Sequence, residues 1–142
     1  MDQAQQELAQ AVGKPGFLLV SRMVGYNPIS FAWGYDLPAE DADRVRYSAI
    51  CEMLSSEALD PTDAFYLSEV GVAPKLQGRG FGTRLIERLD DRLVAPTVVM
   101  RTKNPAMLRV AEKAWGGPLM EFAEESAYAG GRAYVFDRGG GA

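Results

Sequence analysis

The sequence has 142 residues, of which 47% are hydrophobic and 24% charged, and these values are those of one globular domain. It contains no histidine and a single cysteine, Cys51. These counts exclude a Ser-His-Asp or Cys-His catalytic group, a zinc site of cysteine and histidine, and an internal disulfide. No apolar run is long enough for a membrane span or a signal peptide, so we expect a cytoplasmic protein that binds no metal and no membrane.

The net charge of −4 is distributed unevenly along the chain. Nine acidic and two basic residues lie between Asp36 and Glu69, whereas nine basic and four acidic residues lie between Lys75 and Lys113. The overall acidity argues against nucleic-acid binding, which normally needs a net basic surface. The basic segment suits a small polyanion, and the acidic segment either favours a cationic substrate or is an ordinary solvated surface.

The N-terminal half predicts a helix, a β-hairpin and a second helix. Two β-rich runs flank the turn sequence Gly25-Tyr26-Asn27-Pro28, as in an antiparallel hairpin. Farther on, apolar residues recur at helical spacing, namely Val45, Ala49, Ile50, Met53 and Leu54. The predicted segments are an N-terminal helix within residues 1–16, strands at 17–23 and 29–35, and an insert at 36–64 that contains the amphipathic helix.

The C-terminal half alternates strands and helices. Asn104-Pro105 is a strong helix start, with asparagine as the cap and proline at the first helical position. The predicted segments are a strand at 65–72, a helix from Gly80, a strand at 97–102, a helix ending near Trp115, strands at 119–122 and 133–136, and a disordered tail at 138–142. This order predicts one α/β (α+β) domain over residues 1–142 with a mixed sheet.

The segment from Glu69 to Thr83 is the most informative part of the sequence. It predicts a buried strand, a turn that exposes consecutive backbone N–H groups, and a helix start. Glycine at 78, 80 and 82 removes side chains that would keep a ligand away from the backbone. The orphan N–H groups and the positive end of the helix dipole then form a phosphate site. The dinucleotide-binding and P-loop patterns both fail here, so a different phosphorylated cofactor is indicated.

This segment resembles the signature of the GNAT superfamily of N-acetyltransferases, Q/R-x-x-G-x-G/A, at the turn that holds the pyrophosphate of acetyl-CoA. Gln77, Gly80 and Gly82 match the pattern. The preceding Val72-x-Pro74 is typical of the family, and the next strand and the helix after it follow at the expected interval. The resemblance covers residues 17–137 and implies a GNAT-like mixed, mostly antiparallel sheet with a central splayed strand pair flanked by helices.

The resemblance also implies the contacts to acetyl-CoA. The strand before the turn would bond the pantetheine arm through its backbone, with Gly71 allowing close approach of the thioester. The turn amides would hold the pyrophosphate, with Arg79 or Lys75 near the adenosine phosphates. Asn104 resembles the family's cofactor-contacting asparagine, and it also fits a plain helix cap. The implied contacts are Val70, Gly71, Val72, Gln77, Gly78, Arg79, Gly80, Phe81, Gly82, Thr83 and Asn104.

Acetyl transfer to an amine needs an acceptor for the amine proton, and without histidine this is a carboxylate, acting through water, or no more than a desolvating pocket. Glu69 is the best candidate for the catalytic base, because it lies in an otherwise apolar strand just before the expected bulge, where many family members carry an acidic residue. A structural or outward-facing Glu69 is the alternative, since the bulge decides whether Tyr66, Ser68 or Glu69 faces the substrate.

The general acid departs from the family pattern. Many GNAT members carry a tyrosine seven residues after the asparagine, and this sequence has Ala111 there. The departing thiolate would then be protonated by water, by Tyr128 or Tyr134, or by the substrate amine. Trp115 stands where the family usually has glycine, and we interpret it as a packing variation.

The beginning of the chain departs as well, because the family's first strand and one helix have no counterpart. The insert helix or a second subunit could replace the wall of the acceptor site that these elements build. An open sheet edge would also favour a homodimer or another partner. A further possibility is that the sequence starts at an internal methionine of a longer reading frame.

These observations lead to two hypotheses. The first is an acetyl-CoA-dependent N-acetyltransferase that moves the acetyl group to a primary amine of a small molecule or peptide by direct transfer in a ternary complex. The second is a catalytically impaired acyl-CoA-binding module with a sensing or partner-binding role, motivated by Ala111 and the short N-terminus. Both need the same cofactor site, and they differ in turnover.

Overall fold

The elements follow the order that the hydrophobic pattern predicts, with ends that differ by one or two residues. The computed structural model describes residues 3–38, 44–102, 104–124 and 131–138. Its elements are α1 (Gln3–Ala11), β1 (Leu18–Val24), β2 (Asn27–Asp36), α2 (Arg44–Ser56), η1 (Pro61–Asp63), β3 (Ala64–Val72), η2 (Pro74–Leu76), α3 (Phe81–Asp90), β4 (Thr97–Thr102), α4 (Pro105–Trp115), β5 (Met120–Glu124) and β6 (Gly131–Asp137).

The six strands form one sheet in the order β1-β2-β3-β4-β6-β5. The pair β3–β4 is parallel, and the four other neighbouring pairs are antiparallel. The parallel pair needs a crossover, which α3 supplies by returning the chain from the end of β3 to the start of β4. The predicted mixed, mostly antiparallel sheet flanked by helices is therefore confirmed.

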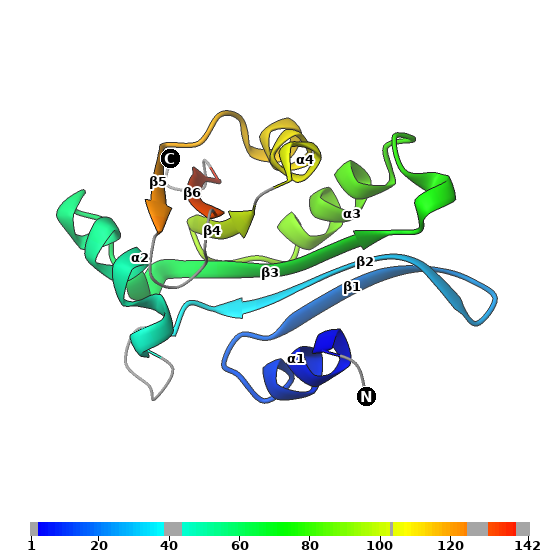
Figure 1. Ribbon diagram of the computed structural model, residues 1–142, viewed down its shortest axis with the longest axis horizontal. Helices are drawn as coiled ribbons and strands as arrows, with labels where there is room; N and C mark the ends of the chain where they lie inside the picture. The colour runs from blue at the N-terminus through cyan, green and yellow to red at the C-terminus, as the bar shows by residue number, and fades with distance from the viewer. Residues whose placement is uncertain (1–2, 39–43, 103, 125–130, 139–142) are drawn as a thin grey trace.

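Helices cover both faces of the sheet (Figure 1). On one face, α3 and α4 pack over side chains that include Ala32, Phe65 and Val98. On the other face, residues of α1 and α2 pack with side chains that include Trp33 and Tyr35. No helix within the described residues is both long enough and apolar enough to cross a bilayer.

The predicted apolar stripe of the insert helix holds α2 against the sheet. Ile50 and Leu54 are fully buried, and Cys51 packs beside them as a small core residue. The stripe missed Tyr47, which is also fully buried because its ring packs edge-on against Tyr66, at 5.1 Å between ring centres. A tyrosine in a core needs a partner for its hydroxyl. The Tyr47 hydroxyl forms a short hydrogen bond with the hydroxyl of Tyr35 on β2.

Both ends of the described chain add detail to the sequence prediction. Arg138, expected to begin a disordered tail, is instead held by hydrogen bonds that its guanidinium donates to the side chain and carbonyl of Asp90 and to the carbonyl of Ala95. The rest of that tail, residues 139–142, lies outside the described residues. At the other end, residues 3–17 contain α1 and no strand, so β1 forms an edge of the described sheet.

Candidate active site

The two central strands separate halfway along their length. β3 pairs with β4 only from Ala64 to Leu67, although β3 continues to Val72 and β4 to Thr102. Beyond Leu67, the edge of β3 that faced β4 has no strand partner within the described structure. Backbone groups of residues 70–72 on this edge can pair with an extended ligand, as an added strand would.

A bulge at Ser68 decides the direction of Glu69. Trp33 of β2 pairs with Glu69 and the next residue of β2 pairs with Leu67, so Ser68 has no partner on β2. Directly paired residues share a face of the sheet, and Glu69 therefore lies on the face of Trp33. Val70 lies on the opposite face, where it packs against the core under α3 and α4. Without the bulge, Glu69 would share the face of Leu67 and Val70 would lie on the face of Trp33, so the bulge decides which of the two side chains lies on each face.

The turn between β3 and α3 is built on two glycines. Gly78 has φ +80° and Gly80 has φ +84°, a left-handed conformation that other residues rarely adopt. Gly80 is the N-cap of α3 and gives its first N–H groups no side-chain acceptor. Gln77 Nε2 donates to the carbonyl of Val72 at 3.1 Å, which folds the turn back onto β3. The amides at the start of α3 are therefore exposed to an anionic ligand.

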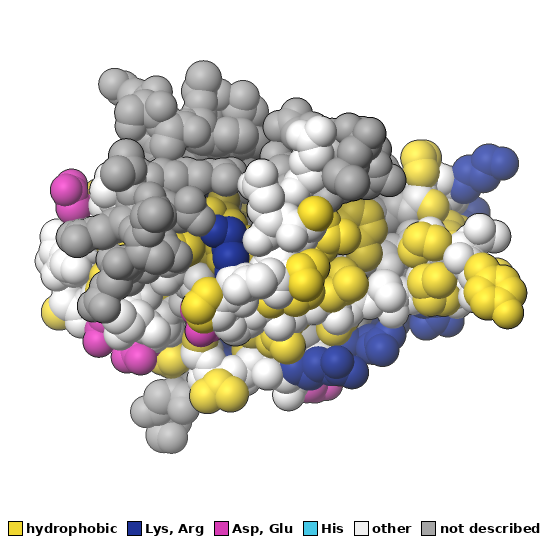
Figure 2. All heavy atoms as spheres, turned by 90° about the horizontal axis from the view of Figure 1, so that it is seen from below, with side chains coloured by type: hydrophobic (Ala, Val, Ile, Leu, Met, Phe, Trp, Pro, Cys, Tyr) yellow, Lys and Arg dark blue, Asp and Glu magenta, His cyan; other side chains and the backbone are white. Residues whose placement is uncertain are grey.

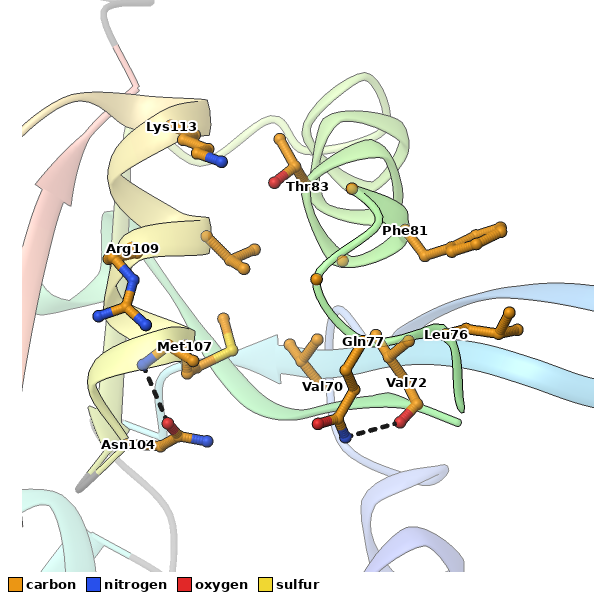
Figure 3. Close-up of a pocket in the computed structure, with 15 residues that line it drawn as sticks. Val70, Val72, Leu76, Gln77, Phe81, Thr83, Asn104, Met107, Arg109 and Lys113 are labelled. Carbon is orange, nitrogen blue, oxygen red and sulfur yellow. Dashed lines mark hydrogen bonds between the residues drawn. The ribbon is translucent and has the colours of Figure 1, made fainter. Parts of the chain in front are cut away.

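These parts line a cleft of about 290 Å³ between α3 and α4 (Figure 3). Nine of the eleven predicted cofactor residues line it, namely Val70, Val72, Gln77, Gly78, Gly80, Phe81, Gly82, Thr83 and Asn104. The sequence prediction missed its other lining residues, which are Leu76, Ala106, Met107, Arg109, Val110 and Lys113.

Two of the predicted cofactor residues do not line the cleft. Gly71 pairs with Phe31 of β2, and a Cβ atom on Gly71 would lie 2.4 Å from the Phe31 ring. Its missing side chain therefore makes room for Phe31, and the expectation that it also lets a thioester approach stays a prediction. Arg79 is exposed on the outer side of the turn, where its carbonyl accepts a hydrogen bond from Arg84 Nη2 at 3.4 Å.

The wall that α4 forms carries most of the missed residues. Arg109 and Lys113 are four residues apart and lie on the side of α4 that lines the cleft (Figure 3). That spacing on a helix starting at Asn104 is the signal that would have found them. Asn104 Oδ1 accepts a hydrogen bond from the Ala106 amide at 2.9 Å, so its helix-cap role is confirmed while the residue also lines the cleft.

A second pocket, of about 260 Å³, adjoins the cleft where β3 and β4 separate. Val70, Asn104 and Met107 line both cavities, so these three residues form the boundary between them. The second pocket contains polar side chains that the cleft lacks, among them Glu69 and Arg101. Two cavities that meet at one boundary suit a transfer between two substrates, and by this expectation we name them the cofactor cleft and the acceptor pocket.

The model of the acetyltransferase (GNAT) family matches residues 5–116 of the sequence. The chain belongs to the GNAT acetyltransferase family. It is therefore an acyltransferase whose family uses acetyl-CoA. No curated protein matches its sequence.

Solved GNAT structures share this fold at low sequence identity. The ribosomal-protein-S18-alanine N-acetyltransferase from Escherichia coli superposes with a TM-score of 0.57 at 15% identity, over 95% of this chain and 76% of that one. An aminoglycoside 6′-acetyltransferase type Ii gives a TM-score of 0.62 at 11% identity, over 96% and 78%. A protein from Bacillus anthracis, solved in complex with acetyl coenzyme A, gives a TM-score of 0.55 at 14% identity, over 90% of this chain and 65% of that one.

Within the GNAT pattern, the residues that depart from the family have packing roles here. Ala111 is fully buried in the core under α3 and α4. Trp115 packs on Phe136, and its Nε1 donates to Asp90 at 2.8 Å. Tyr134 is buried on β6 and lines neither cavity, while the other tyrosine considered as an acid, at position 128, lies outside the described residues.

Proposed function

We propose that this protein transfers the acetyl group of acetyl-CoA to a primary amine by direct transfer in a ternary complex. The observation that carries this proposal is that the two cavities share one boundary at the splay of β3 and β4. One cavity ends at the open amides of α3, and the other contains Glu69. Family membership and the fold of the neighbours agree with it. The composition, with six methionines and one cysteine, suits a reducing compartment, so we place the activity in the cytoplasm.

The residues that line the cleft fit coenzyme A. Gly78 and Gly80 let phosphate oxygens approach the backbone at the start of α3, and Arg109 and Lys113 add positive charge from α4. Apolar side chains and the open backbone edge at residues 70–72 suit the pantetheine arm, which carries amide groups in an extended chain. The thioester would then lie beside the boundary residues Val70 and Met107.

Acetyl-CoA supplies a carbonyl carbon activated by a thiol leaving group. In the proposed reaction the amine nitrogen bonds to that carbon, the carbon–sulfur bond breaks, and the amine loses one proton. Glu69 accepts this proton, through a water molecule where the distance requires one. The sulfur takes a proton from water, because neither cavity is lined by a tyrosine among the described residues, and the resulting hydroxide regains a proton from Glu69.

Two measurements test the proposal. Acetyl-CoA should raise the melting temperature of the protein, because it binds the folded chain and not the unfolded one. Amines should release free thiol from acetyl-CoA only when the protein is present. Stabilisation without thiol release from any amine of a broad panel would contradict catalysis and favour an acyl-CoA-binding module. The absence of any stabilisation would contradict the placement of the cofactor.

We also infer a homodimer that pairs through β1. This strand forms an edge of the described sheet, and Leu19, Met23 and Val24 on it expose apolar side chains. Light scattering during size-exclusion chromatography should give twice the monomer mass. A Leu19→Asp variant should shift it toward the monomer, and a parent protein that is monomeric at all concentrations would contradict the inference.

A further inference from the structure

The residues that line the cofactor cleft carry charge of one sign. Arg109 and Lys113 of α4 are basic, and no lining residue within the described structure is acidic. Both side chains are exposed, and neither has a hydrogen-bond, ion-pair or aromatic partner in the described part of the chain. Both cations are therefore available to an anion that enters the cleft.

The arginines close to the turn are held outside the cleft. Arg84 Nη2 donates to the carbonyl of Arg79 at 3.4 Å, and the Arg84 guanidinium carbon lies 4.9 Å from the centre of the Phe81 ring. Arg22 of β1 packs on the same ring, at 5.5 Å from its centre. None of these three arginines lines the cleft, so the positive side chains inside it come from α4.

Lys113 lies at the end of the cleft that is distant from the acceptor pocket. It follows the boundary residue Met107 by six residues on α4, which places it about 9 Å farther along the helix axis. Figure 3 shows its amine directed across the cleft toward Thr83, in the first turn of α3. Arg109 lies one turn of α4 closer to the boundary. The two cations thus stand at different depths of the cleft.

The surface of the molecule is also more basic near the turn that precedes α3. On the face in Figure 2, most basic side chains lie toward the end with the β1–β2 hairpin, and most acidic ones lie toward the end with α2. The turn with η2 lies at the hairpin end as well (Figure 1). This distribution of charge would attract a polyanion to the start of α3.

Coenzyme A carries phosphate at two places. A diphosphate joins the pantetheine arm to adenosine, and a phosphate monoester stands on the 3′ oxygen of the ribose. The monoester has about two negative charges at neutral pH and three acceptor oxygens. With the arm at the splay and the diphosphate at the start of α3, the ribose lies farther from the boundary than the diphosphate does. Its phosphate would then reach the depth of Lys113.

We infer that Lys113 binds the ribose 3′-phosphate of coenzyme A, and that Arg109 faces the diphosphate. Lys113 then selects a 3′-phosphorylated donor, whereas the resemblance placed Arg79 or Lys75 near the adenosine phosphates, and neither of these lines the cleft. This inference rests on the proposed function, which places coenzyme A in the cleft. A purely structural role is the alternative, because a lysine in the last turn of α4 also interacts favourably with the helix dipole.

The test compares coenzyme A with 3′-dephospho-coenzyme A, which lacks only the ribose phosphate. Calorimetric titration gives a Kd for each ligand. The parent protein should bind coenzyme A at least about fivefold more tightly at low ionic strength, because the phosphate adds a hydrogen bond between two charged groups. The preference should decrease at high salt, which screens an exposed pair. Equal affinity for the two ligands overturns the inference and leaves the proposed function intact, whereas binding of neither ligand overturns both.

Variants of α4 assign the preference to one residue. Lys113→Met keeps the aliphatic stem and removes the charge, so the ratio of the two Kd values should fall close to one. Its affinity for 3′-dephospho-coenzyme A should stay the same, and Lys113→Arg should keep most of the ratio. Arg109→Gln should weaken the binding of both ligands by the same factor, because both contain the diphosphate. Arg92→Gln, at an exposed site that lines neither cavity, is the control and should keep both affinities.

Two outcomes for these variants overturn the inference. A Lys113→Met variant that weakens both ligands equally, or that lowers only the melting temperature, has lost a charge of general or structural effect. A Kd ratio that falls to one in Lys75→Met or Arg79→Gln, and persists in Lys113→Met, places the ribose phosphate at the turn.

Discussion

The cofactor cleft and the acceptor pocket adjoin, but they are built in different ways. The cleft takes most of its lining from one continuous segment, residues 70–83, and offers a ligand mainly backbone groups held open by glycines. The acceptor pocket takes its polar groups from side chains on two strands that separate, and an aromatic core orients one of them. Backbone recognition tolerates many neighbouring side chains, whereas side-chain recognition depends on each residue. Substitutions in the two cavities should therefore affect different steps.

Glu69→Gln should give the largest effect. The substitution keeps the size of the side chain and one acceptor oxygen but removes the proton acceptor, so kcat should fall at least about 100-fold. The affinity for coenzyme A should stay the same, since Glu69 lines only the acceptor pocket. Steady-state kinetics and a thermal-shift titration with coenzyme A measure the two quantities.

The pH dependence of Glu69→Gln adds a second readout. A carboxylate base must be deprotonated, so the parent should lose activity as the pH falls, and the variant should lack that decline. Glu57→Gln, on an exposed residue after α2, is the matched control and should behave as the parent. A Glu69→Gln variant with the parent kcat would remove this residue from the mechanism.

Gly78→Glu should affect the other cavity. A carboxylate at this position would face the phosphates of coenzyme A, and its repulsion should weaken binding by about 30-fold, or roughly 2 kcal/mol. Gly25→Glu is a close control, because Gly25 also has a positive φ, +61°, and open space around its Cβ position, at the far hairpin turn. Calorimetric titration of both variants with coenzyme A should separate the effect of a charge at the cleft on the affinity from the effect of backbone strain, which both variants share. Equal affinity in the two variants would contradict the placement of the phosphates.

The difference between the cavities also explains what the sequence could predict. Features that depend on residues close together in sequence were predicted correctly. Gly78 and Gly80 determine a tight turn, and Asn104 caps the helix that begins at the next residue. The acceptor pocket depends on contacts between distant residues, such as Arg101 with Tyr47, which no local pattern contains. The direction of Glu69 required the cross-strand register as well, because a bulge of one residue reverses the face that a side chain occupies.

Met107→Ala should join the two cavities. Met107 lines both of them, and its side chain extends from α4 toward Val70 (Figure 3). Removing it should make room for a longer acyl chain, so kcat/KM for butyryl-CoA relative to acetyl-CoA should rise about tenfold, the effect of roughly one or two methylene groups in a pocket. Met53→Ala truncates a half-buried methionine on α2 that lines neither cavity and should leave the ratio unchanged. An unaltered acyl preference in Met107→Ala would show that the boundary lies elsewhere.

Trp115→Phe should have the smallest effect, because it changes the far ends of the helices that enclose the cleft. Asp90 Oδ1 accepts hydrogen bonds from Trp115 Nε1 and from Arg138 Nε, which ties the C-terminal ends of α3 and α4 to the end of β6. Phenylalanine keeps the ring on Phe136 and loses one hydrogen bond to a carboxylate, so the free energy of unfolding should fall by about 1 kcal/mol. The melting temperature should fall by about 4 °C.

Asp90→Asn should destabilise more, since it also removes the charge opposite Arg138. Both variants should retain the parent's affinity for coenzyme A and its choice of amine, because neither residue lines the cofactor cleft or the acceptor pocket. A change in amine preference in Trp115→Phe would mean that the clamp at this end of α4 positions the boundary residue Met107, and that the two cavities are coupled through the helix.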